Sequence, residues 1–259
     1  MLVAASLVGF FALRAAVPKS APDRATAVDA ELAAAARLPE SPAPAFKPGK
    51  PRLLDRSEKV YRWAPVLRAA EARTAPSGTA RVVATLNTRT PEGTTNIVLV
   101  VGARHADGTL WLRVRLAVLP NNTTGWVRRS ALGGYHFVHT RLVVNLARLE
   151  ATLFYDGRVI FRAPVGVGQS RSPTPTGFFY VREELTRFAN PFYGPIAFGT
   201  SARSSVLTDW PSGGFVGIHG TNEPDLIPGR VSHGCIRLRN RDIVQLSRLM
   251  PIGTPVTVR

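Results

Sequence analysis

Short stretches in which apolar residues alternate with polar ones, or in which β-branched residues cluster, recur along the chain from about residue 80 onward. These stretches cover residues 81–86, 97–101, 110–116, 142–146, 153–155, 158–161 and 255–258. Runs of this length and composition are typical of β-strands. Turn-forming pairs lie between several of them, namely Asp107-Gly108, Asn121-Asn122 and Asp156-Gly157. The pattern predicts a mostly β protein, with a two-residue hairpin at Asp156-Gly157.

Two segments depart from the strand pattern. Pro173 and Pro175 exclude a regular central strand, because proline cannot donate to the hydrogen-bond ladder, so residues 173–177 are predicted to form a shaped loop. Residues 242–249 carry Ile243, Val244, Leu246 and Leu249 at near-helical spacing, which predicts one short helix near the C-terminus.

Composition divides the chain into four parts. Residues 1–16 begin with twelve uncharged, mainly apolar positions, too few for a transmembrane helix of about 20 residues but suitable for a signal peptide or anchor. A buried N-terminal helix is the alternative. Residues 17–57 are rich in proline and alanine and are expected to form a spacer, followed by a β domain at 58–134 and a second domain at 137–259.

The net charge of +16 is spread along the chain and favours anionic partners such as nucleic acid, acidic lipids or cell-wall polymers. Zinc-finger spacing, an aromatic RNA-binding signature and a P-loop are all missing from the sequence, so we do not expect nucleic acid to be the partner.

Cys235 is the single cysteine of the sequence, so it cannot form an internal disulfide. It lies two residues after His233, on the same side if that segment is extended, and sixteen after His219. The intervening Pro224, Pro228 and Gly229 suit a loop that would bring His219 back to the thiol. A histidine beside a cysteine can generate the nucleophilic thiolate, and Gly234 allows backbone amides to turn towards a developing oxyanion.

Three other interpretations stay open on the residues alone. Cys235 could be a buried, inert thiol, as free cysteines commonly are. His219, His233 and Cys235 could ligate zinc, although the spacing matches familiar sites poorly and no fourth ligand stands out. Asp209 and Trp210 could pack near the site without taking part in chemistry.

The segments Ile218-His219-Gly220-Thr221 and Ser232-His233-Gly234-Cys235-Ile236-Arg237-Leu238 together resemble the active-site signature of the YkuD-type L,D-transpeptidases. The segments 174–178 and 253–256 also match this family in order and placement. The resemblance spans 137–259 and implies a YkuD-like mixed β-sandwich with a short helix after the cysteine motif. In the preceding part, the Gly125-Trp126-Val127 segment resembles the end of a bacterial SH3-like β-barrel, which would serve as a targeting or interface module; an arbitrary small barrel is the alternative.

The resemblance implies a role for each matching residue. Cys235 would be the nucleophile and His219 the general base, with its ring held by the carbonyl of Gly220 or a neighbour. The backbone amides of His233, Gly234 and Cys235 would form the oxyanion hole. Ser232 and the His233 ring would shape the site or simply stabilise the loop. Substrate binding would fall to Gly220, Thr221 and Arg237, although Arg237 could equally be a structural ion-pair residue.

The resemblance further implies a cell-wall enzyme that joins peptidoglycan stem peptides by 3→3 cross-links, acts outside the cytoplasm and needs no metal or organic cofactor. Carbapenem β-lactams are the expected inhibitors. An L,D-carboxypeptidase with water as acceptor, an enzyme that attaches a protein to the wall, and a non-catalytic wall-binding protein are the alternatives.

Overall fold

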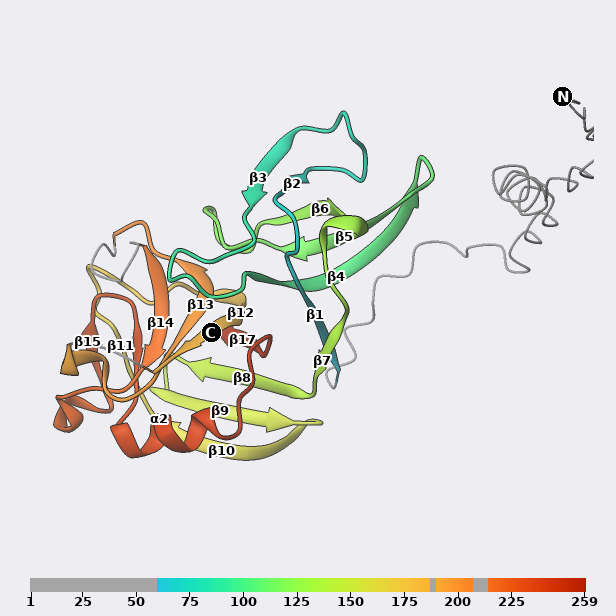
Figure 1. The fold of residues 1–259 in the computed structure, drawn as a ribbon. Helices are drawn as coiled ribbons and strands as arrows, with labels where there is room; N and C mark the ends of the chain where they lie inside the picture. The colour runs from blue at the N-terminus through green and yellow to red at the C-terminus, as the bar shows by residue number, and fades with distance from the viewer. Residues whose placement is uncertain (1–59, 187–189, 207–213) are drawn as a thin grey trace, which may run out of the picture. The chain divides into compact units, whose positions relative to one another are not determined.

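A computed structural model describes residues 60–186, 190–206 and 214–259 of the chain. The predicted apolar segment 1–16 and spacer 17–57 lie outside the described residues, as do Asp209 and Trp210. Residues 49–259 form one unit, within which the described strands make two sheets (Figure 1).

The first sheet is built from the part of the chain before residue 139. Its seven described strands are ordered β3-β2-β6-β5-β4-β1-β7. Their bounds are β1 Tyr61–Pro65, β2 Ala70–Arg73, β3 Val82–Leu86, β4 Ile97–Ala106, β5 Thr109–Arg115, β6 Thr124–Arg128 and β7 His136–Val138, with a 3-10 turn η1 at Arg129–Ala131. The Asp107-Gly108 pair makes the predicted two-residue turn between β4 and β5, and both residues have positive φ angles, as such hairpin turns require.

The second sheet follows, with ten described strands in the order β10-β9-β8-β17-β12-β13-β14-β16-β11-β15. Their bounds are β8 Thr140–Asn145, β9 Glu150–Tyr155, β10 Arg158–Pro164, β11 Gly166–Gly168, β12 Gly177–Leu185, β13 Ala197–Arg203, β14 Phe215–His219, β15 Gly229–Ser232, β16 Ile236–Arg237 and β17 Pro255–Val258. Two short 3-10 turns, η2 Pro191–Tyr193 and η3 Pro224–Leu226, and the helix α2 Asn240–Ser247 complete this part. Parallel pairs (β14 with β16, β17 with β8, β11 with β15) stand among antiparallel ones, so the sheet is mixed as expected.

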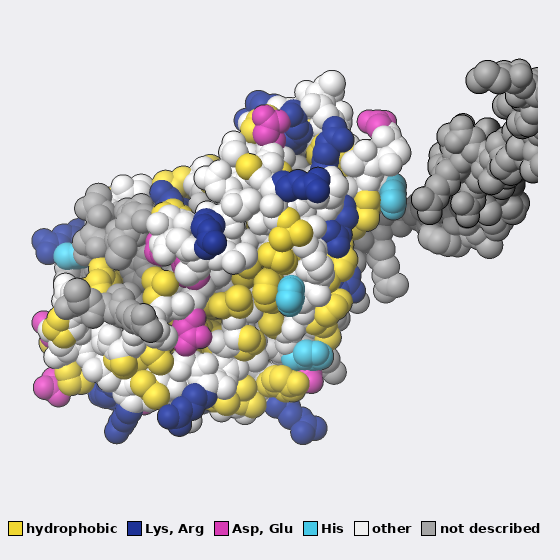
Figure 2. Space-filling model, in the orientation of Figure 1, with side chains coloured by type: hydrophobic (Ala, Val, Ile, Leu, Met, Phe, Trp, Pro, Cys, Tyr) yellow, Lys and Arg dark blue, Asp and Glu magenta, His cyan; other side chains and the backbone are white. Residues whose placement is uncertain are grey.

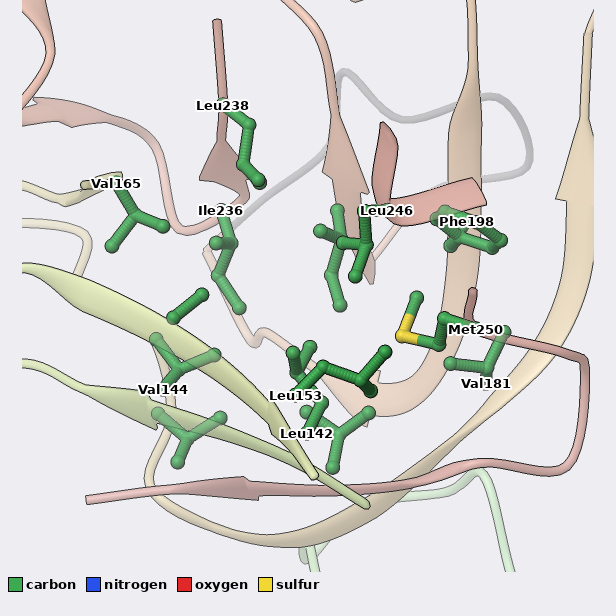
Figure 3. Packing of buried hydrophobic residues seen from close by; sticks show 14 of the residues in the cluster. Leu142, Val144, Leu153, Val165, Val181, Phe198, Ile236, Leu238, Leu246 and Met250 are labelled. Carbon is green, nitrogen blue, oxygen red and sulfur yellow. The ribbon is translucent and has the colours of Figure 1, made fainter. Parts of the chain in front are cut away.

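One hydrophobic core fills the space between the two halves of this long, curled sheet (Figure 3). Leu142 and Leu153 enter it from β8 and β9, and Phe198 and Ile236 enter it from β13 and β16. Helix α2 covers part of the core with buried Ile243 and Leu246, the positions that the helical spacing predicts. The helix begins and ends two residues earlier than the sequence pattern suggests.

A second cluster of apolar side chains joins the two sheets. Ile97 and Leu99 of β4 pack with Tyr180 of β12, and the partly buried Trp63 packs against this cluster. The Tyr180 hydroxyl donates to the carbonyl oxygen of Ile97 at 3.0 Å, and burial raises the pKa of Tyr180 to about 12. The two β regions therefore pack against each other through this apolar cluster.

The strand predictions are confirmed in both regions, and β17 spans the predicted residues 255–258. Residues 173–176 form the predicted loop, and Asp156-Gly157 forms the predicted hairpin between β9 and β10. Within the described residues, no helix is long and apolar enough to cross a bilayer. The resemblance of the first sheet to an SH3-like barrel stays a prediction.

Candidate active site

The site residues are brought together by the parallel pairing of β14 with β16. Ile218 lies opposite Ile236 and His219 opposite Arg237. Because side chains alternate along strands, both isoleucines enter the core on one face of the sheet, and His219 and Arg237 share the opposite face. Residues 220–231 loop back as the sequence predicts. Cys235 then lies one residue before β16, and Gly217, two residues before His219 on β14, contacts its Sγ atom.

The His219 ring is fully buried and fixed in orientation. Its Nδ1 atom lies 2.6 Å from the carbonyl oxygen of Gly220, the contact that the family resemblance implies. A carbonyl can only accept, so Nδ1 must donate, and in the neutral ring the lone pair then belongs to Nε2. Tyr193 of η2 meets the ring edge-on, with centroids 5.0 Å apart.

Asn240, the first residue of α2, supports the turn that carries the Gly220 carbonyl. Its Oδ1 accepts a hydrogen bond from the backbone N–H of Thr221 at 2.9 Å. A Cβ atom at Gly220 would lie 2.4 Å from the same oxygen and 3.0 Å from the Cα of Gly194. Glycine at 220 therefore leaves the space that the Asn240 side chain occupies. Sequence reasoning missed Asn240, which lies two residues before the predicted helix.

The Cys235 thiol lies in a small buried group. Its side chain clusters with Ala197 of β13 and Phe215 of β14, and the residue is 7% exposed. The backbone N–H of Gly217 donates to Sγ at 3.3 Å. A donor of this kind stabilises a thiolate more than a thiol, because hydrogen bonds to a charged acceptor are stronger.

The Ser232–Cys235 loop is tied down by side chains on both of its sides. Ser232 Oγ donates to the Cys235 carbonyl at 2.6 Å and accepts from the Gly234 N–H at 3.1 Å. Gly234 has φ of 126°, a conformation that favours glycine. Thr174 Oγ1 donates to the Gly234 carbonyl at 2.9 Å and accepts from the N–H of Gly168. Because a peptide unit is planar and trans, the N–H of Cys235 points away from Thr174.

These contacts bear on the expected role of Ser232 and on the backbone amides expected to form the oxyanion hole. Ser232 acts as a loop stabiliser here, and the Gly234 amide is engaged by the Ser232 hydroxyl, although it is one of the three amides expected to form the oxyanion hole. The chain bends at Gly234, between the exposed His233 and the buried Cys235. Among the residues that the structure describes, no group of three His, Cys, Asp or Glu side chains is arranged to hold a metal ion.

The Arg237 guanidinium is already engaged within the chain. Its Nη1 atom lies 3.0 Å from Oε2 of Glu223, and the group lies over the Phe192 ring at 4.2 Å from the centroid. The residue is buried, whereas the Glu223 side chain is half exposed. Thr221 is buried, and its Oγ1 accepts from the N–H of Glu223.

Two arginines give the surroundings of Phe215 a positive character. The guanidinium carbons of Arg182 and Arg203 each lie 4.1 Å from the Phe215 centroid. Arg182 pairs with Glu183 at 3.1 Å and with Glu92 at 3.4 Å. Burial lowers the pKa of Arg203, and the charge of Arg182 lowers it further. Burial raises the pKa of Glu183, against the opposing effects of Arg182 and of hydrogen bonds from two threonines.

A cavity of about 290 Å³ lies elsewhere, on the first sheet. Its lining includes Arg68, Arg128 and Trp111 but none of the predicted site residues. The residues predicted from the sequence therefore lie at β14 and β16 and in the adjoining loops, and not in this cavity. Over the visible surface of the described residues, Arg side chains are dispersed, in agreement with the spread of charge along the sequence (Figure 2).

Comparison with known proteins gives this site a context. The YkuD family, the L,D-transpeptidase catalytic domain, matches residues 139–258. YkuD of Bacillus subtilis (strain 168), itself named as a candidate L,D-transpeptidase, is 38% identical over 117 residues, which are 45% of this chain and 64% of that protein. YqjB of the same organism, with the same candidate description, is 30% identical over 125 residues, covering 45% of this chain and 69% of YqjB.

A solved structure is also similar, that of the C442S mutant of the Enterococcus faecium L,D-transpeptidase. It is 26% identical, covers 46% of this chain and 49% of that one, and has a TM-score of 0.36. The match to the B. subtilis YkuD protein described above covers somewhat less than two thirds of the length of that protein. On the sequence matches, the chain belongs to the family of YkuD-type L,D-transpeptidases.

Proposed function

We propose that this protein is a peptidoglycan L,D-transpeptidase in which Cys235 is the nucleophile and His219 the general base. The observation that carries the proposal is the pairing of β14 with β16, which sets an oriented histidine and a cysteine on one face of the sheet. The Gly217 N–H on Sγ supports a thiolate at this position. Family membership supports acyl transfer, and the cysteine mechanism and the cross-linking outcome are our proposal.

The first half-reaction acylates the enzyme. His219 takes the thiol proton, and the Cys235 thiolate attacks the carbonyl of the third, L-configured residue of a tetrapeptide stem. Backbone N–H groups stabilise the oxyanion, chiefly that of Cys235, because Thr174 fixes its peptide unit through the Gly234 carbonyl. The intermediate collapses to a thioester as the terminal D-amino acid leaves, taking the proton from His219.

The second half-reaction transfers the acyl group. The amine of a second stem loses a proton to His219 and attacks the thioester carbonyl. The thiolate of Cys235 then leaves and takes this proton back from His219, which gives a 3→3 cross-link and restores the thiol and the neutral histidine of the starting enzyme. Water in place of the amine would give the L,D-carboxypeptidase reaction, and an amine of a protein would attach that protein to the wall.

This function places the enzyme in the cell envelope, with the polypeptide before residue 58 holding it there or directing its export. The net charge of +16 would favour association with an anionic wall. The SH3-like region 58–134 and the catalytic region 137–259 are proposed as separate domains in sequence, each with its own hydrophobic cluster.

Incubation with a defined disaccharide-tetrapeptide, followed by mass analysis, tests the proposal. A cross-linked dimer supports transpeptidation, whereas tripeptide alone identifies a carboxypeptidase, and unchanged substrate supports wall binding without catalysis. A carbapenem should acylate the protein once, at Cys235, and Cys235→Ala should prevent this. An unmodified mass after prolonged incubation with the carbapenem would refute the nucleophile.

A further inference from the structure

We propose that the part of the chain that forms the first sheet supplies one wall of the surroundings of Cys235, and that Ala117 in this wall limits the size of the acyl group that the cysteine accepts. The inference rests on the proposed function and deepens it, because it assigns a specificity-determining residue outside the catalytic region 137–259.

Ala117 lies in the loop between β5 and β6, residues 116–123. It is partly buried and packs against the group formed by Cys235, Ala197 and Phe215. Leu185 and Tyr193 pack against the same group from the second sheet. A residue 118 positions before the cysteine therefore packs against the group of side chains that contains the proposed nucleophile.

The loop is held in this position by hydrogen bonds to two strands of the second sheet. Asn121 binds both backbone groups of Arg203 on β13: its Nδ2 donates to the carbonyl at 2.6 Å, and its Oδ1 accepts from the N–H at 2.9 Å. Asn122 Oδ1 accepts from the N–H of Phe178 on β12 at 2.8 Å. A Cβ atom at Gly177 would lie 2.5 Å from the Asn122 side chain, so glycine is needed at 177 for Asn122 to occupy this position.

A second contact fixes the first sheet on the same side of the site. The hydroxyls of Thr90 and Thr94 donate to the Glu183 carboxylate, at 2.8 Å and 2.5 Å. Glu183 pairs with Arg182, and Arg182 lies over Phe215, a member of the Cys235 group. Loop 116–123 and the Thr90–Thr94 turn thus join the two regions, each through a contact at or next to an arginine that lies over Phe215.

The lining indicates what the wall selects. Ala117, Leu185, Ala197 and Phe215 present apolar atoms, so the group seated against them is the aliphatic part of an acyl donor. Alanine leaves more space than any other residue with a Cβ atom. A larger side chain at 117 would fill the space beside Sγ and exclude bulky acyl groups while still admitting small reagents.

The test compares Ala117→Leu with Ala75→Leu in the full chain. Ala75 is exposed in the connection between β2 and β3, so it provides the same change of side chain away from the site. Cys235 is labelled with iodoacetamide and with the bulkier N-phenylmaleimide, and acylation by the disaccharide-tetrapeptide is followed by intact mass. We expect Ala117→Leu to lower the ratio of the two labelling rates, N-phenylmaleimide over iodoacetamide, at least fivefold. The same substitution should lower the rate of acylation by the disaccharide-tetrapeptide at least tenfold. Ala75→Leu should match the wild type in both.

If the ratio of N-phenylmaleimide to iodoacetamide labelling in Ala117→Leu lies within twofold of the wild-type ratio, the proposal that Ala117 limits access to Cys235 is wrong. The ratio of labelling rates depends only on access to the thiol, so it tests the role of Ala117 even if the wild type is not acylated by the tetrapeptide. Absence of acylation in the wild type would refute the proposed function and not the role of Ala117. Ala117→Gly is the substitute test variant if the leucine variant fails to fold. It should raise the same ratio, and an unchanged ratio would equally overturn the inference.

Discussion

The Nδ1 atom of His219 donates to the carbonyl oxygen of Gly220, its own neighbour in the chain, at 2.6 Å. In Ser-His-Asp enzymes a carboxylate holds the base in the correct tautomer. Here a backbone carbonyl does so, and it is in turn positioned by Asn240, which binds the next N–H along the chain. The orientation of the proposed base therefore depends on the start of α2.

Asn240→Ala should slow acylation of Cys235 at least tenfold. It removes the acceptor for the Thr221 N–H, and an unsatisfied buried group costs about 1–3 kcal/mol, which the turn can relieve by moving the Gly220 carbonyl. Asn240→Asp keeps an oxygen at the same position and is the matched control. Stopped-flow acylation by a carbapenem measures both. Equal rates for the alanine variant and the wild type would contradict this role.

Thr174→Val should weaken the oxyanion site without harming the nucleophile. Valine has the shape of threonine but cannot bind the Gly234 carbonyl or the Gly168 N–H, so the peptide unit that carries the Cys235 N–H loses its fixed direction. Loss of an oxyanion donor costs about 10²–10³ in rate, and we expect about tenfold or more for misdirecting one. Acylation should fall while alkylation by iodoacetamide is retained, and Thr174→Ser should restore acylation. A parallel fall in alkylation would instead indicate a general loss of structure.

Gly253→Ala should destabilise the protein by about 2–4 kcal/mol, since it combines a positive φ with overpacking. Gly253 has φ of 82°, and a Cβ atom there would lie 2.0 Å from Trp63 of the first sheet. Gly134→Ala is the control, because a Cβ atom there meets nothing within 4 Å. Urea denaturation measures the difference. A loss below about 0.5 kcal/mol for Gly253→Ala would mean that Trp63 can move away without cost.

Paired substitutions separate the two roles left open for Arg237. The contacts with Glu223 and Phe192 support the ion-pair role, so Arg237→Gln and Glu223→Gln should have similar effects on KM for the tetrapeptide, within about threefold. If Arg237 binds a substrate carboxylate, Arg237→Gln alone would raise KM, because one bidentate charged contact contributes about 1.5–3 kcal/mol. Steady-state kinetics of the two variants decides between these outcomes.

The parts of this structure that depend on neighbouring residues were predictable from the sequence. The hairpin at Asp156-Gly157 and the last strand follow from local turn chemistry and alternation, and the His219–Gly220 contact follows from the family motif. The distant partners were not predictable. Nothing in the sequence around Asn240 or Ala117 indicates a contact with the site, because such contacts arise only when strands far apart in the chain become neighbours.

The pH dependence of stability tests the buried charge cluster between the two sheets. Glu183 is bonded by Thr90 and Thr94, pairs with Arg182 and lies over Gly199, with Glu92 nearby. Burial raises its pKa above the ordinary value of 4.5, so the folded protein keeps this proton at a pH where the unfolded chain has released it. Stability from this group is therefore present below about pH 4.5 and is lost as pH rises towards the folded pKa.

Glu183→Gln cannot titrate, so its free energy of unfolding should decline less than that of the wild type as pH rises through this window. Glutamine still accepts from both threonines, which keeps the rest of the contact comparable. Urea midpoints measured from pH 4.5 to 7 give the two slopes. Parallel slopes would show that the Arg182 charge offsets the burial of Glu183 fully, and that the cluster holds the sheets together as an ordinary ion pair.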